Sequence, residues 1–188
     1  MTELSQLTST FLDFLSSQDK NWSLCTLSFM ACFLVFFALY IPLRHYRQQW
    51  TKVYVICFSL FFAFKANGAL MWLLPFTTFV SWYLTHSMMR LKHGKLRKTG
   101  LAITIFTELI PLLYYKYTNF TLEIFHELLR SNFSPMKLLL PVGISFFTFQ
   151  AISYTVDVYK GRYPKTAKLL DYTFYLTFFP LLIAGPIT

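Results

Sequence analysis

The feature that most constrains the fold of this chain is a series of apolar stretches of membrane-spanning length. A helix needs roughly 20 apolar residues to cross a hydrocarbon core about 30 Å thick. Inside lipid the backbone must satisfy its own hydrogen bonds, so each stretch is expected to be helical. We therefore predict an all-α transmembrane bundle of six spans. The expected spans are residues 22–43, 53–66, 69–89, 101–117, 138–159 and 169–187.

The composition supports lipid as the main solvent of the chain. Hydrophobic residues make up 55% of it and charged residues 13%, whereas a soluble domain carries roughly 25% charged residues. A soluble core of this size could not cover so much apolar surface, and an apolar chain is not expected to be disordered. Residues 1–188 are thus interpreted as one membrane-embedded unit whose first partner is the lipid bilayer.

Two further stretches are amphipathic rather than spanning. In residues 4–15 and 119–133, apolar side chains recur at helical spacing between polar ones. Neither stretch is long or apolar enough to cross, so we expect both to lie at the membrane surface. Residues 1–21 are predicted to form an extracytoplasmic interfacial segment, and they lack the basic start of a signal peptide.

The distribution of the basic residues predicts an orientation. The formal net charge of +9 could suggest nucleic acid, but the 17 basic residues lie in short clusters between apolar stretches. We therefore expect no nucleic-acid partner. Residues 44–52, 90–98 and 160–168 hold twelve of the 17. Since basic loops stay in the cytoplasm, the N-terminus is predicted to be extracytoplasmic.

Polar residues inside the fifth predicted span are the candidate site. Gln150, Ser153 and Asp157 fall on one helical stripe, and polar groups at membrane depth generally face protein or a wet cavity. Two interpretations stay open: the three residues line a substrate passage, or they join helices while Asp157 pairs with Lys160. Glu108, in the fourth span, is the other intramembrane acid and has no partner identifiable from sequence.

No residue is assigned a catalytic or metal-binding role from its pattern. The sequence has no Gly-rich phosphate loop, nucleophile elbow or H-E-x-x-H motif. The four histidines lie at or beside predicted interfaces and show no metal-ligand spacing; they are His45, His86, His93 and His126. We therefore expect no metal and no bound cofactor.

Three motifs carry a family resemblance. Residues 141–161, PVGISFFTFQAISYTVDVYKG, resemble the membrane-bound O-acyltransferase family, in its alginate O-acetyltransferase branch. Residues 115–120, YKYTNF, resemble the segment ahead of that motif, and residues 178–187, FFPLLIAGPI, resemble the one after it. The family often has Gln at the position of Leu181 and Arg at that of Lys160. The resemblance covers roughly residues 53–188.

The resemblance implies a multi-span bacterial inner-membrane enzyme. Such enzymes move an acyl group, in this branch acetyl, from a cytoplasmic thioester such as acetyl-CoA to a hydroxyl. The implied acceptor is an extracytoplasmic polysaccharide, and a periplasmic acetyltransferase is an implied partner. The family's catalytic histidine is expected beyond residue 187, so residues 1–188 are expected to be an N-terminal part, inactive alone. A transporter or a non-catalytic membrane subunit is the alternative.

Overall fold

The computed structural model describes residues 27–91, 94–129, 140–163 and 165–184. Every regular element within these ranges is helical, which confirms the predicted all-α class. The elements are α2 (Leu27–Tyr46), α3 (Gln48–Asn67), the 3₁₀ helix η1 (Gly68–Trp72), α4 (Leu73–Arg90), α5 (Lys95–Leu129), α6 (Ile144–Tyr159), α7 (Leu169–Thr177) and α8 (Phe179–Ala184). The N-terminal stretches 1–21 and 4–15 lie outside the described residues.

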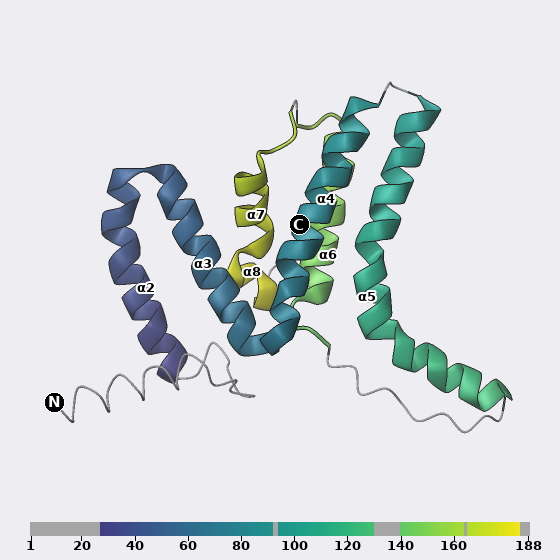
Figure 1. The fold of residues 1–188 in the computed structure, drawn as a ribbon, viewed down its shortest axis with the longest axis horizontal. Helices are drawn as coiled ribbons and strands as arrows, with labels where there is room; N and C mark the ends of the chain where they lie inside the picture. The colour runs from purple at the N-terminus through teal and green to yellow at the C-terminus, as the bar shows by residue number, and fades with distance from the viewer. Residues whose placement is uncertain (1–26, 92–93, 130–139, 164, 185–188) are drawn as a thin grey trace.

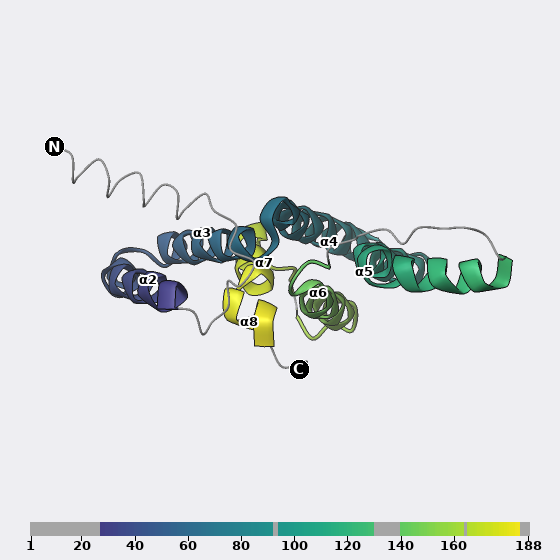
Figure 2. The ribbon, with the colours of Figure 1, turned by 90° about the horizontal axis from the view of Figure 1, so that it is seen from below.

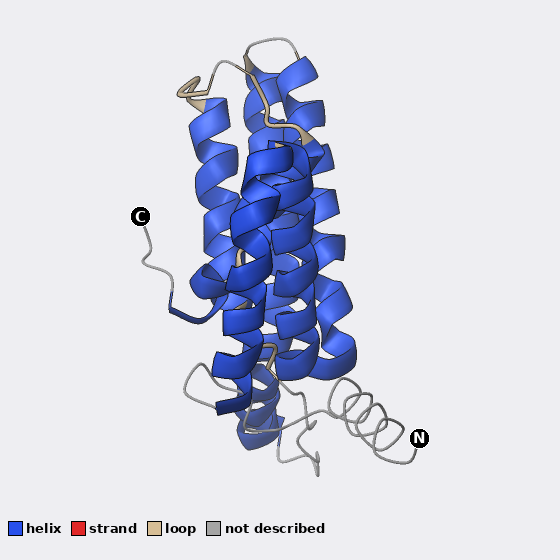
Figure 3. Cartoon of the chain, turned by 90° about the vertical axis from the view of Figure 1, so that its left-hand side faces the viewer, coloured by secondary structure: helices blue, strands red, loops and turns tan. Residues whose placement is uncertain are grey.

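The helices run roughly parallel to one axis and alternate in direction (Figures 1 and 3). The connections α2–α3, α4–α5 and α6–α7 lie at the same end of the bundle, at the top of Figure 1, while η1 lies at the opposite end. These three connections fall within the basic segments 44–52, 90–98 and 160–168. The end at which they meet is called the basic end below.

Among the described residues, one apolar helical stretch, Gln48–Arg90, is long and apolar enough to cross a membrane, with a mean hydropathy of 1.6 over 18 residues. Met30–His45 is a shorter apolar helix. Figure 1 shows that the chain reverses at η1, so Gln48–Arg90 is a helical hairpin of α3 and α4. Gly68 allows this reversal because its φ of 58° lies in the left-handed region, which side chains other than glycine disfavour.

The helices form two layers around a shared core. Figure 2 shows α2, α3, α4 and α5 in one row, with α6 and α8 on one side of it. One apolar cluster joins the row to α6 and α7; it contains Ala63, Leu74, Leu112, Ile144, Phe147, Ala151, Tyr172 and Leu176. A second cluster is largely aromatic and joins α2 and α3 to α8. There the Phe36 and Phe58 ring centroids lie 4.2 Å apart, and Phe179 packs against both rings.

The fourth predicted span differs from the observed helix. The sequence predicts a span over residues 101–117 and a separate interfacial helix over 119–133, but described residues 119–129 continue α5. The reason is local: no Gly or Pro lies between Pro111 and the end of α5, so nothing ends the helix. The final part of α5 turns away from the bundle in Figure 1.

Prolines and a glycine explain two other differences. Helix α6 begins at Ile144 rather than 138, after Pro141 and Gly143, whose φ is 84°. The sixth span is broken at Phe178 into α7 and α8, because the ring of Pro180 is incompatible with a continuous helix. Pro75 is tolerated in α4 because it lies in the first turn, where a backbone N–H has no intrahelical acceptor.

The shared basic end generates a topological prediction. In a chain whose native cysteines are replaced, single cysteines at Arg47, Lys95 and Lys165 should all react with an impermeant reagent from the same side of a sealed vesicle. A cysteine at Ala69, in η1, should react only from the opposite side. Labelling of the three basic positions from different sides would contradict the arrangement in Figure 1.

Candidate functional site

A buried carboxylate joins four helices at the centre of the bundle. Glu108 of α5 is 9% exposed. Its Oε1 accepts hydrogen bonds from Ser81 of α4 and from Thr155 of α6, the latter at 2.9 Å. The Ser81 hydroxyl lies 2.7 Å from the Tyr172 hydroxyl of α7, and the Thr155 hydroxyl lies 2.9 Å from that of Thr85. We call these five residues the Glu108 cluster.

The hydrogen bonds of the Glu108 cluster have a fixed direction. A hydroxyl has one proton to donate, and Ser81 and Thr155 both direct theirs to Glu108. Tyr172 must then donate to Ser81, and Thr85 to Thr155. Two relays of hydroxyl groups therefore converge on a single carboxylate oxygen. This arrangement satisfies polar groups whose burial without partners would be costly.

A cavity of about 140 Å³ lies beside the Glu108 cluster, between α4, α5, α6 and α7. It is lined by Phe76, Thr77, Val80, Ser81, Thr107, Glu108, Ile110, Pro111, Phe147, Thr148, Ala151 and Leu176. Two of its polar atoms are buried and have no hydrogen-bond partner among the described residues: Oε2 of Glu108 and Oγ1 of Thr148. Such atoms in a cavity indicate a place where a polar group of a ligand could bind.

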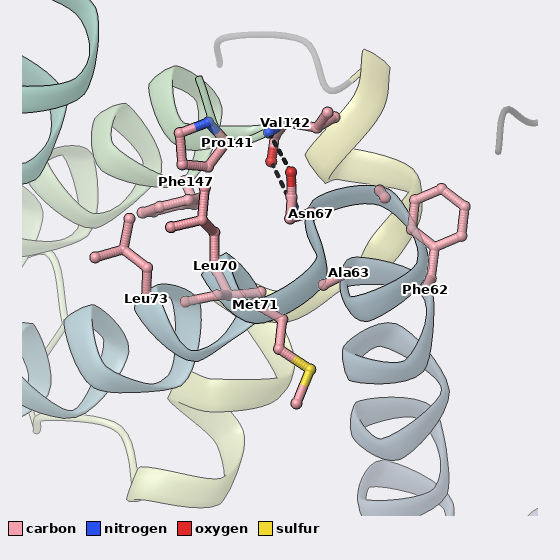
Figure 4. Close-up of a pocket in the computed structure, with 11 residues that line it drawn as sticks. Phe62, Ala63, Asn67, Leu70, Met71, Leu73, Pro141, Val142 and Phe147 are labelled. Carbon is pink, nitrogen blue, oxygen red and sulfur yellow. Dashed lines mark hydrogen bonds between the residues drawn. The ribbon is translucent and has the colours of Figure 1, made fainter. Parts of the chain in front are cut away.

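A second pocket, between α3, η1 and the start of α6, is structural rather than functional (Figure 4). Its volume of about 10 Å³ is at most that of one water molecule. Asn67 closes it: its Oδ1 accepts from the backbone N–H of Val142 at 2.6 Å, and its Nδ2 donates to the Val142 carbonyl at 3.5 Å. This pair of bonds ties the turn after α3 to the residues that precede α6.

The predicted stripe on α6 does not join the Glu108 cluster. Gln150 donates from Nε2 to the Tyr175 carbonyl of α7 at 3.0 Å, and Ser153 and Asp157 are half-buried. The buried polar residues of α6 are instead Thr148 and Thr155. The structure therefore places the three stripe residues together along α6 but on a different face from Glu108. Their role as a substrate passage stays a prediction.

The alternative pairing of Asp157 with Lys160 is wrong. Asp157 pairs with Arg162, whose guanidinium lies 2.7 Å from the carboxylate. The reason is the turn after α6, where Gly161 has a φ of 76°. The Arg162 N–H also donates to the Asp157 carbonyl at 3.0 Å, which brings the arginine back beside the end of the helix.

Sequence reasoning missed the hydroxyl partners of Glu108, although a signal for them was present. Ser81 and Thr85 follow Thr78 at spacings of three and seven residues, so the three share one face of an otherwise apolar helix. Thr148 and Thr155 are likewise seven residues apart on α6. Small hydroxyl residues in an apolar span are typical of helix–helix contacts in membranes.

His86 has a structural environment at the basic end. Its Nε2 lies 3.1 Å from an Arg90 guanidinium nitrogen, which can only donate, so Nε2 is the acceptor. Its Nδ1 then donates to Thr166 at 2.9 Å, and its ring stacks on Trp82 with centroids 5.4 Å apart. Trp82 also donates to the Ala167 carbonyl at 2.9 Å. Together these contacts hold the α6–α7 connection against α4.

The other histidines provide no further chemistry in the described structure. His45 is exposed, and the side chains of His93 and His126 lie outside the described residues. Within the described part of the chain, no group of three or more His, Cys, Asp or Glu residues could hold a metal ion.

Comparisons with known proteins connect this helical bundle to acetyl-transferring enzymes. The chain is 42% identical over 91 residues to the probable alginate O-acetylase AlgI of Pseudomonas aeruginosa, and 40% identical over 91 residues to that of Azotobacter vinelandii. Each match covers 46% of this chain and 18% of the relative. The chain is related to the alginate O-acetylases. The resemblance to the membrane-bound O-acyltransferase family is thereby confirmed.

A longer match extends this relationship across most of the chain. The peptidoglycan O-acetyltransferase of Helicobacter pylori is 28% identical over 186 residues, which covers 85% of this chain and 35% of that protein. The chain thus spans only a fifth to a third of the lengths of these relatives. No family model and no solved structure matches it.

Two threonines on the buried face of α6 test the Glu108 cluster. Thr155→Val should lower the free energy of unfolding by about 1 kcal/mol, because it removes a donor to Glu108. Thr148→Val should leave stability unchanged or raise it, because the Thr148 hydroxyl has no partner to lose. Thermal unfolding of both variants in the same detergent gives the comparison. Equal destabilisation by the two substitutions would contradict the assigned hydrogen bonds.

Proposed function

We propose that this chain forms membrane-embedded machinery of an O-acyltransferase that moves an acetyl group from a cytoplasmic thioester toward a hydroxyl of an extracytoplasmic polysaccharide. The observation that carries the proposal is the match to O-acetyl-transferring relatives named for two different polysaccharides, alginate and peptidoglycan. The second match extends over 85% of the chain, so the relationship is not confined to one motif.

The basic end is proposed to be the donor side. Lys95, Lys98, Lys165 and Lys168 are exposed there. Their positive charge would favour an anionic thioester such as acetyl-CoA, and the positive-inside rule places this end in the cytoplasm. The N-terminus would then be extracytoplasmic, in a bacterial inner membrane, with the glycan acceptor and a periplasmic acetyltransferase partner on the opposite side.

Within this scheme the chain supplies a scaffold and a route for reactants. The Glu108 cluster holds α4, α5, α6 and α7 in one register, while the stripe of Gln150, Ser153 and Asp157 offers polar groups along the side of α6. The base that activates the acceptor hydroxyl is proposed to be a histidine beyond residue 187, as the family resemblance implies.

The proposal is tested by acetyl transfer in sealed vesicles. The full-length coding product, with its partner acetyltransferase, should transfer label from internal acetyl-CoA to an external polysaccharide. Residues 1–188 alone should transfer none. Failure of the full-length protein with every thioester donor and polysaccharide acceptor would refute the acyltransferase proposal, and transfer by residues 1–188 alone would refute the assignment of the base.

The passage role of Asp157 has its own test. Asp157→Asn should lower acetyl transfer by the full-length protein with little change in unfolding, since ion pairs involving an exposed partner contribute little stability; Arg162 is 64% exposed. Arg162→Gln is the matched control, because it removes the same ion pair but keeps the carboxylate. Equal transfer rates per folded molecule in Asp157→Asn, Arg162→Gln and the unmodified protein would contradict a passage role.

A further inference from the structure

The cavity beside Glu108 has the properties of a binding site that the proposed acyl transfer does not use. Its walls are largely apolar, and its volume of about 140 Å³ is close to that of an engineered protein cavity, about 150 Å³, that binds benzene. Phe76 and Ile110, which line it, are 65% and 48% exposed on the outer surface of the bundle. These two side chains give the cavity an apolar side on the surface of the described helices, from which an apolar molecule could enter.

The polar atoms of the cavity specify more than an apolar ligand. Thr77 and Thr107 bond to backbone carbonyls of their own helices, at 2.8 Å and 2.9 Å, and Ser81 is used by the Glu108 cluster. Two buried polar side-chain atoms of the cavity lack a hydrogen-bond partner in the described structure: Oε2 of Glu108 and Oγ1 of Thr148. Their residues are 9% and 2% exposed, so bulk water does not satisfy them.

We propose that this cavity binds a small uncharged alcohol: one hydroxyl on an apolar body no larger than a six-membered ring. The ligand hydroxyl donates to Oε2 of Glu108 and accepts from the Thr148 hydroxyl, which supplies both missing partners with one group. The apolar body lies against Phe76, Ile110 and Leu176. An anionic ligand is excluded because the walls offer no positive charge, and an ammonium cation because it could not accept from the Thr148 hydroxyl. A sugar ring is excluded because its other hydroxyls would find no partners.

The test uses two probes of nearly equal shape, 3-fluorophenol and 3-fluorotoluene, titrated against the full-length protein in lipid nanodiscs and followed by ¹⁹F NMR. Partition into the lipid is subtracted with a protein whose cavity is filled by Ala151→Leu, and Val80→Phe serves as a second filled variant. Gel filtration and helicity confirm that each variant is folded. The phenol should bind at least about fivefold more tightly than the toluene, because only its hydroxyl pairs the two buried atoms.

Substitutions of two threonines that line the cavity locate the effect. Thr148→Val should abolish the preference for the phenol and leave toluene binding unchanged. Thr107→Val should change neither, because the Thr107 hydroxyl is already bonded to Ile103. Equal affinity of both probes for the unmodified protein would overturn the alcohol site in favour of a plain apolar cavity. Signals identical to those of the filled variants would overturn it in favour of bound water only.

Discussion

The arrangement of α4, α5, α6 and α7 depends on the burial of one carboxylate. Removing Glu108 from water is costly unless donors replace the lost hydration, and the donors come from different helices: Ser81 from α4 and Thr155 from α6. A helix rotates by about 100° per residue, so a slip of one residue would move either hydroxyl away from the carboxylate. The cluster therefore fixes the rotation of these helices, and Tyr172 extends the constraint to α7.

Apolar packing alone would leave that rotation less well defined. Lipid tails are as apolar as the Phe and Leu side chains, so helix association in a membrane relies on close packing and polar contacts. The basic end adds two such contacts. Lys52 of α3 pairs with Asp171 of α7 at 2.5 Å. Arg97 of α5 donates to the Tyr159 carbonyl at the end of α6 at 3.3 Å, and its guanidinium lies 5.5 Å from the Tyr159 ring centroid. The bundle is thus constrained both at its centre and at its basic end.

Sequence could predict the helical segments and their basic connections because both follow from local composition. The candidate site is harder to predict from sequence, because the hydrogen-bond acceptor of a threonine in a helix depends on which residues lie beside it. Thr104 and Thr107 donate to carbonyls of their own helix, whereas Thr155 reaches Glu108. All three look alike in sequence. The stripe of Gln150, Ser153 and Asp157 was easily found because it is strongly polar, but the buried face of α6 carries its polarity in two threonines, Thr148 and Thr155.

The two oxygens of Glu108 have different environments: one oxygen holds the helices together, and the other is available for binding. Oε1 receives both donors that join the helices, whereas Oε2 has no partner in the described residues. On α4 and α6 the other residues that line the cavity precede Ser81 and Thr155, so the cavity lies on the side of the cluster away from the basic end. A carboxylate needed only to hold helices would gain from pairing both oxygens. Because four helices already hold Glu108 in place, Oε2 is held in position before any ligand arrives. Binding therefore loses no conformational entropy in ordering this side chain.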